Sequence, residues 1–237
     1  MSIEDFKRCL ESSHYVDNLG SQDDPLRFFL LSCAAVNEQQ ETIDLVPSYA
    51  LKIKSLIQCF KCGYEGRTSV NETCLSLAIP KKQKNPCRLI DLVEKTFEPG
   101  TFQRPCACGS SLSSVRRVLG SCPQVLSLHL KRYDNSYSRK RSNLVIPTPE
   151  IDLSTVLDPE IKTVNTIYQL RCVITHKGTN LDSGHFTATI FEQGVPLEVD
   201  DMKILNLKNR YDMFTGGSIF LYENKKCLSE LLSTWHR

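Results

Sequence analysis

Long apolar runs are absent from this sequence, which argues against a membrane protein. The longest candidate, residues 25–36, is about half of the ~20 residues that a helix needs to cross a bilayer, and it contains Arg27. The first five residues, Met1 to Asp5, are acidic and include no apolar signal region. We therefore expect a protein of the cytoplasm, the nucleus or both, with no membrane partner.

An excess of charge of one sign is also absent. The chain has 29 basic and 27 acidic residues and a net charge of +2, which argues against a broad cationic face for nucleic acid. Two short stretches, residues 81–86 and 138–142, are basic and rich in turn residues. Either could be a nuclear address or a nucleic-acid patch, but we expect solvated loops and no nucleic-acid partner. The composition leaves the oligomeric state open.

Cysteine, by contrast, is abundant, with 11 among 237 residues. Four lie in two tight pairs, Cys59/Cys62 and Cys106/Cys108, and the other seven are scattered singly. In a chain without a signal region, close pairs indicate metal ligands and single cysteines indicate small buried apolar residues. A secreted disulfide framework is the alternative, and the odd count of cysteines weakens it.

The two cysteine pairs have the form of a zinc site. Cys59 and Cys62 are separated by two residues and followed by Gly63, which permits the tight turn of a zinc knuckle. Cys106 and Cys108 follow 44 residues after Cys62, with one intervening residue where two are commoner. Four thiolates fill a tetrahedral zinc ion and leave no open position, so the predicted cofactor is a structural zinc. The alternative is four cysteines in strand turns that bind no metal.

The pattern of apolar residues predicts helices first and mostly strands afterwards. Residues 2–36 are expected to be helical in two pieces, and the second piece opens at Asp24, which can accept free amide hydrogens, followed by Pro25. A short amphipathic helix is expected over residues 89–97. Alternating apolar residues predict strands over 70–79, 125–130, 168–174, 186–191 and 218–222.

One histidine motif carries more functional information than any other segment. It reads His176-Lys177-Gly178, then Ser183-Gly184-His185-Phe186-Thr187-Ala188, and later Val199-Asp200-Asp201. This pattern resembles the histidine box of the ubiquitin-specific proteases. The resemblance implies that His185 is a general base, that Asp200 orients it, and that Asp201 is an auxiliary polar group. In that chemistry a thiolate attacks an isopeptide carbonyl and an imidazole takes and returns the proton.

Other segments resemble the same family in the same order. Residues 122–133 are similar to its Leu-Pro-x-Val-Leu-x-Leu-His-Leu-Lys-Arg-Phe strand, residues 22–31 to its Gln-Gln-Asp helix, and residues 217–222 to its closing strand. The resemblance implies ubiquitin and ubiquitinated proteins as partners. It also implies an α+β, papain-like cysteine protease fold in one truncated catalytic domain: a remnant of the thumb helices over 1–50, zinc-bearing fingers over about 51–125, a palm over about 125–223 and a tail over 224–237.

The sequence departs from the family pattern at the nucleophile. The family carries its catalytic cysteine in a Gly-Asn-Thr-Cys-type box upstream of the Gln-Gln-Asp helix, and this sequence starts after that point. Cys9 lacks the glycine and asparagine context of the box. We therefore expect the polypeptide as written to be inactive, either as a fragment, isoform or truncated gene model of a deubiquitinase, or as a pseudoenzyme that binds ubiquitin or a partner protein. A zinc-ribbon nucleic-acid module is a third alternative, supported only by the cysteines and the basic stretches.

Overall fold

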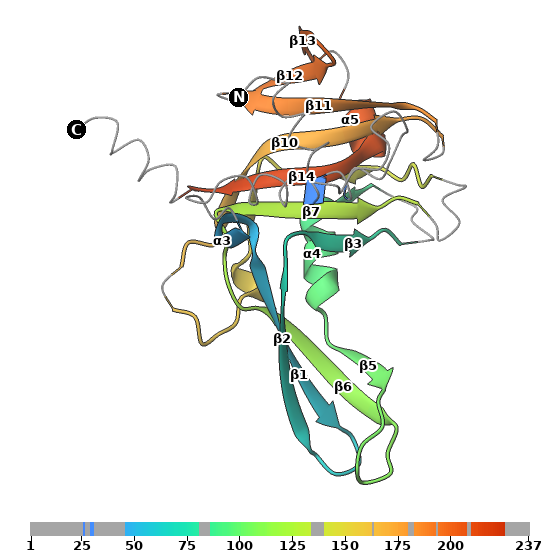
Figure 1. Cartoon of the computed structure of the whole chain (residues 1–237), viewed down its shortest axis with the longest axis vertical. Coiled ribbons are helices and arrows are strands. Elements are labelled where there is room, and N and C mark those ends of the chain that lie inside the picture. The colour runs from blue at the N-terminus through green and yellow to red at the C-terminus, as the bar shows by residue number, and fades with distance from the viewer. Residues whose placement is uncertain are drawn as a thin grey trace, which may run out of the picture.

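Two sheets of unequal size make up the part of the chain described by a computed structural model. The larger sheet forms the upper body in Figure 1, and the smaller one projects below it. The helix expected over the first residues lies outside the described part, and three described positions of the second are helical. The described residues are 26, 29–30, 46–80, 86–133, 140–162, 164–179, 183–192, 194–207 and 210–225.

The projecting sheet, which we call the finger sheet, is antiparallel with the order β2-β1-β6-β5. Its central strand β1 (Leu51–Cys59) pairs with β2 (Glu65–Glu72) on one side and with β6 (Leu112–Leu119) on the other. β5 (Gly100–Gln103) completes it beside β6. Because β1 ends at Cys59 and β6 starts at Leu112, the two cysteine pairs lie in turns at the same end of this sheet.

The larger sheet, which we call the palm sheet, runs in the order β13-β12-β11-β10-β14-β7-β3, with β9 also paired to β10 (Figure 1). A small parallel pair, β4 with β8, and four short helical segments accompany the two sheets in the described residues. The bounds are β3 (Leu75–Ala78), β4 (Cys87–Arg88), β7 (Val125–Lys131), β8 (Val145–Ile146), β9 (Glu150–Asp152), β10 (Ile167–Lys177), β11 (His185–Glu192), β12 (Val195–Asp200), β13 (Lys203–Asn206), β14 (Gly217–Asn224), α3 (Val46–Tyr49), α4 (Leu89–Phe97), η1 (Ser154–Val156) and α5 (Tyr211–Gly216).

Most of the predicted elements in the described residues are confirmed. The helix expected over 89–97 has the bounds of α4, and the last four predicted strands coincide with β7, β10, β11 and β14 to within a few residues. The single strand expected over 70–79 is wrong. The chain leaves the finger sheet at Glu72, bends, and joins the palm sheet at Leu75, so the alternation of apolar residues belongs to β3 alone.

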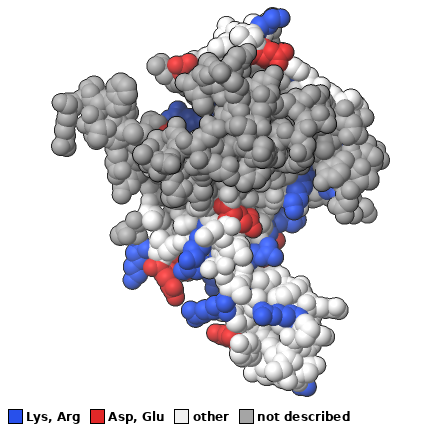
Figure 2. Space-filling model, in the orientation of Figure 1, with Lys and Arg blue, Asp and Glu red and all other residues white. Residues whose placement is uncertain are grey.

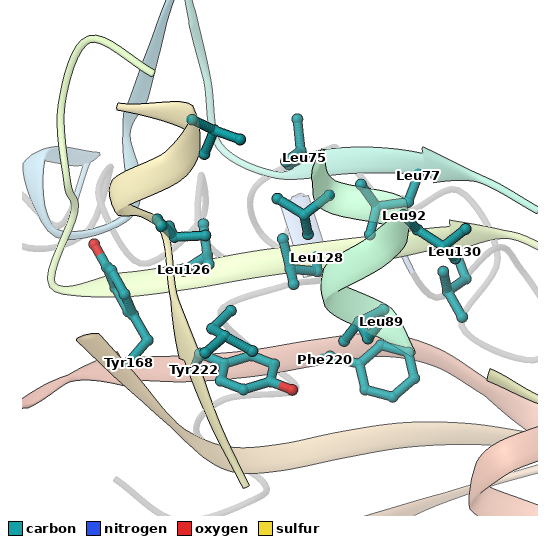
Figure 3. Packing of buried hydrophobic residues seen from close by; sticks show 14 of the residues in the cluster. Leu75, Leu77, Leu89, Leu92, Leu126, Leu128, Leu130, Tyr168, Phe220 and Tyr222 are labelled. Carbon is teal, nitrogen blue, oxygen red and sulfur yellow. The ribbon is translucent and has the colours of Figure 1, made fainter. Parts of the chain in front are cut away.

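The core lies between α4 and one face of the palm sheet. Leu89 and Leu92 of α4 lie over Leu128 of β7 and Phe220 of β14, as Figure 3 shows. Each of these four side chains is at most 3% exposed, and full burial of one such side chain stabilises the fold by about 1.5–3 kcal/mol. This packing fixes the central strands β7 and β14, and β10, paired to β14, carries the neighbouring strands β11 and β12.

Two described residues of the second basic stretch, Lys140 and Arg141, contact this body through their side chains. The Lys140 ammonium donates to the backbone carbonyls of His176 and Gly178, and the Arg141 guanidinium donates to the carbonyl of Ile79 at 2.9 Å. Of the other basic stretch, all but one residue lie outside the described part. Every helix that the structure describes is too short or too polar to traverse a membrane.

Candidate active site and metal centre

A hairpin at the side of the palm sheet brings the predicted catalytic residues together. His185 is the first residue of β11, and Asp200 is the last residue of the antiparallel strand β12. Gly194 closes the turn between the strands with φ +83°, a left-handed conformation that glycine adopts without strain. Asp201 follows in the next turn, also with a positive φ of +51°. Ligand atoms of all three predicted site residues lie within 4.8 Å of one another.

The contact between His185 and Asp200 is short and accessible. His185 Nε2 lies 2.6 Å from Asp200 Oδ1, and the two side chains are 46% and 34% exposed. The hydrogen bond from His185 lowers the pKa of the Asp200 carboxyl below its ordinary value. Asp200 is therefore ionised at neutral pH and accepts a hydrogen bond from Nε2–H of His185. In this tautomer the unprotonated nitrogen of the ring is Nδ1, which can accept a proton. This is the arrangement that a histidine base requires.

The two cysteine pairs lie in two similar turns at the tip of the finger sheet. The amide of Gly63 donates to the carbonyl of Cys59 at 3.0 Å, and the amide of Gly109 donates to that of Cys106 at 2.9 Å. Both glycines have positive φ values, +71° and +80°. The turn expected from the first glycine is therefore present, and the second pair has its own equivalent despite its shorter spacing.

The four sulfur atoms fit a tetrahedral metal site. Cys59 and Cys108 are separated by 3.6 Å and Cys62 and Cys106 by 3.7 Å, measured between Sγ atoms, and all four Sγ atoms lie within 4.8 Å of one another. Zinc–sulfur bonds of about 2.3 Å in a regular tetrahedron place sulfur atoms ~3.8 Å apart. Backbone N–H groups of Cys62 and Lys61 lower the pKa of Cys59 to about 6. At Cys62 a backbone hydrogen bond from Tyr64 is outweighed by burial and by the neighbouring sulfurs, which together raise its pKa to about 11.

Sequence reasoning missed a group of residues behind the histidine loop. His176 is buried in β10, and its Nδ1 is hydrogen-bonded to the hydroxyl of Tyr133 at 2.7 Å. Beside them, Lys177 of β10 forms an ion pair with Glu198 of β12. Tyr133 itself could have indicated the contact with His176, because it stands at the end of a strand motif that usually ends in phenylalanine.

A finger sheet that holds four clustered cysteines, joined to a palm sheet that holds a His–Asp pair, is the fold of a ubiquitin-specific protease. A sequence model of the ubiquitin carboxyl-terminal hydrolase family matches residues 4–222, and the chain belongs to this family.

Individual relatives agree with the family match. The chain is 28% identical to ubiquitin carboxyl-terminal hydrolase 21 of Rattus norvegicus over 159 residues, which are 63% of this chain and 28% of that protein. It is 25% identical to ubiquitin carboxyl-terminal hydrolase 44-B of Xenopus laevis over 174 residues, 65% of this chain and 25% of that protein. The chain thus spans well under half the length of these relatives.

A solved structure has the same fold. It is the Ubp8-containing SAGA DUB module bound to monoubiquitin, which matches with a TM-score of 0.70 at 19% identity. The match covers 86% of this chain and 48% of the chain in that structure.

Proposed function

We propose that this domain binds ubiquitin and carries the base and orienting acid of a cysteine-type deubiquitinase site. The observation that carries the proposal is the 2.6 Å contact between His185 and Asp200, and both residues lie in the segment that the family model matches. The two relatives described above are named ubiquitin carboxyl-terminal hydrolases, which supports the same substrate class.

The reaction that this pair would support is thiol-dependent hydrolysis of a ubiquitin isopeptide bond. His185 Nδ1 takes the proton from a cysteine thiol, and the thiolate sulfur forms a bond to the isopeptide carbonyl carbon. His185 then gives the proton to the leaving lysine amine as the carbon–nitrogen bond breaks, and water hydrolyses the resulting thioester. Asp200 stays ionised throughout and fixes the ring. Asp201, in the adjacent turn, is assigned the auxiliary polar role.

Whether a cysteine nucleophile is present decides between cleavage of ubiquitin conjugates and binding of ubiquitin alone. In the described residues, the group formed by His185, Asp200 and Asp201 contains no cysteine. We therefore propose that the 237-residue polypeptide by itself binds ubiquitin without cleaving it. A pseudoenzyme and a piece of an active deubiquitinase would both behave in this way.

The ubiquitin-binding surface is assigned to the hollow between the finger sheet and α4. A cavity of about 730 Å³ lies there, lined among others by Ile57 of β1, Val115 of β6 and Leu92 of α4. The solved neighbour that is bound to monoubiquitin supports a ubiquitin-sized ligand for this fold. On the face drawn in Figure 2, both basic and acidic side chains lie on the described surface, and the net charge of the chain is only +2, which favours a protein ligand over a nucleic acid.

The cofactor is proposed to be one structural zinc ion. Cys59, Cys62, Cys106 and Cys108 would hold it, because their sulfur separations match tetrahedral zinc. A bound zinc ion would link the two turns at the finger tip and neutralise the thiolates. The site has no open ligand position, so the metal takes no part in the reaction.

Calorimetric titration with ubiquitin and a fluorogenic ubiquitin cleavage assay test this function together. We expect saturable but weak binding, unchanged in His185→Ala, and no turnover in either protein. Introducing a charge into the hollow with Val115→Glu should weaken binding at least tenfold, because an unpaired charge would be desolvated in the complex. Absence of binding by the wild-type chain would refute the proposal. Turnover that His185→Ala abolishes would refute its inactive part and require a cysteine outside the site described.

A further inference from the structure

The position of His185 depends on the backbone around it. Its side chain is 46% exposed, so packing of the ring itself contributes little to its placement. His185 is paired across the strands with Lys177, and the connection between β10 and β11 runs between these two residues. Whatever fixes the two ends of this connection therefore also fixes the histidine.

Both chain neighbours of His185 lie against the ring of His176, which is 1% exposed. The ring of Phe186 lies 4.7 Å from that of His176, measured between centroids. At Gly184, with φ +149°, a Cβ atom would lie 2.4 Å from His176 Nε2 and 2.6 Å from the carbonyl oxygen of Lys177. Only glycine permits this approach, so the backbone directly before the histidine rests on the buried ring.

The orientation of the His176 ring is set by Tyr133. Its hydroxyl is hydrogen-bonded to His176 Nδ1 at 2.7 Å, and the two rings meet edge to face at 6.0 Å. His176 Nε2 is buried and has no hydrogen-bond partner among the described residues. The tyrosine hydroxyl is thus the one group that satisfies this imidazole in that part of the chain, and it occupies a position where the family motif has phenylalanine.

Lys140 holds the start of the same connection. Its ammonium donates to the carbonyl of His176 and, at 3.2 Å, to that of Gly178, while its backbone amide donates to the carbonyl of Thr179 at 3.2 Å. Lys140 is also the β-bridge partner of Tyr133. Two side chains of one short segment therefore hold the β10 end of the connection, one through the buried ring and one through the backbone.

We propose that Tyr133, Lys140 and His176 are positioning residues for His185. They act through Gly184 and the other backbone contacts described above, and they keep the exposed imidazole where the carboxylate of its partner can reach it. Their role in catalysis rests on the proposed function of His185 as a base. The placement of the histidine itself can be measured without any catalysis.

Nuclear magnetic resonance of the histidine rings in the full 237-residue chain provides the test. In Tyr133→Phe we expect the ring signals of His185 to move toward those of Asp200→Asn, in which the partner carboxylate is lost. The amides of Gly184 and Phe186 should exchange with solvent about fivefold faster, the effect of losing one ordinary hydrogen bond. Slowly exchanging amides of the finger sheet should keep their rates.

A matched control removes a hydroxyl from another histidine. Ser76 Oγ lies 3.3 Å from His129 Nδ1 in the palm sheet, so Ser76→Ala deletes an equivalent contact and should leave the His185 signals in place. Lys140→Met should reproduce the effect of Tyr133→Phe, and Lys140→Arg, which keeps a donor for the carbonyls, should restore the wild-type signals.

Two results would overturn the proposal. One is a His185 spectrum that Tyr133→Phe leaves unchanged. The other is an equal acceleration of exchange throughout the chain, because that would show a general loss of stability. A wild-type chain that fails to bind ubiquitin, while the His185 signals respond as expected, would contradict the proposed function and leave the positioning role standing.

Discussion

Burial lowers the pKa of His176 to about 4, from an ordinary value of 6.5, and the positive charge of Lys140 acts in the same direction. The unfolded chain therefore takes up a proton as the pH falls below 6.5, whereas the folded chain does so only near pH 4. The stability associated with the neutral ring is complete above pH 6.5 and is lost as the pH falls through this window.

We predict that acidification from pH 7 to pH 4.5 costs about 1–3 kcal/mol of stability through this one residue, since each unit of pKa shift corresponds to about 1.4 kcal/mol. Urea unfolding at a series of pH values measures it. In His176→Phe the slope of stability against pH should decrease by about one proton between pH 6 and 4.5. An identical slope in the variant would assign the acid sensitivity to other groups.

Arg132 is a second residue whose charge is buried, and it is held by backbone carbonyls alone among the described contacts. Its guanidinium donates to the carbonyls of Gly217 at 2.6 Å, Phe214 at 2.8 Å, Arg141 at 2.9 Å and Asn143 at 3.0 Å. Burial lowers its pKa to about 10, so it remains charged at neutral pH. It joins the end of β7 to the start of β14.

We predict that Arg132→Lys destabilises the fold by about 2–4 kcal/mol, because a single ammonium cannot reproduce the planar set of donors and leaves buried carbonyls unpaired. Arg141→Lys is the matched control. That side chain makes one such bond, to the carbonyl of Ile79, and its replacement should cost about 1 kcal/mol or less. Chemical denaturation of both variants measures the difference, and equal losses would contradict this account of Arg132.

At the scale of elements, the two proposed metal-binding turns both belong to the finger sheet. We predict about one zinc ion per purified chain, and Cys106→Ser should abolish it, because the fourth thiolate is lost. Cys172→Ser is the control, since this partly buried cysteine of β10 lies outside the cluster. Elemental analysis measures the metal content. Zinc that persists in Cys106→Ser would exclude the proposed ligand set.

Removal of zinc by a chelator should loosen one sheet and spare the other. The two turns at the finger tip would lose a link that contributes on the order of 10 kcal/mol in small peptide sites. The apolar core around α4 and the palm sheet takes in only the opposite ends of the finger strands, at Leu51, Ile53 and Leu119, away from the cysteine turns. Amide exchange should therefore accelerate in β1 and β6 and stay unchanged in β7 and β14. Uniform acceleration would show that the two sheets unfold as one unit.

How much could be predicted from the sequence differs between these elements. α4 was predictable because its apolar stripe is complete and because the Asp91 carboxylate accepts a hydrogen bond from the backbone amide of Arg88 at the start of the helix. The division of residues 65–78 into β2 of the finger sheet and β3 of the palm sheet was not predictable. Alternation of apolar residues along a strand does not say which sheet the strand joins. The contact of His185 with Asp200 could be expected from the family motif. The hydrogen bonds of Lys140 to the carbonyls of His176 and Gly178 could not be expected, since a basic stretch has no periodicity that would place them.

At the scale of the whole molecule, the order of the strands in space differs from their order in the chain. β14 (Gly217–Asn224) is the last described strand, yet it lies between β7 and β10 and pairs with both. During synthesis the ribosome therefore completes the β7 side and the β10–β13 side before the strand that joins them exists. Until residue 224 has emerged, β7 and β10 each present an edge without its partner strand. The hairpin of His185 and Asp200 belongs to the β10 side. Such edges attract other strands. We therefore expect newly made chains to pair with other strands more readily than the folded protein does.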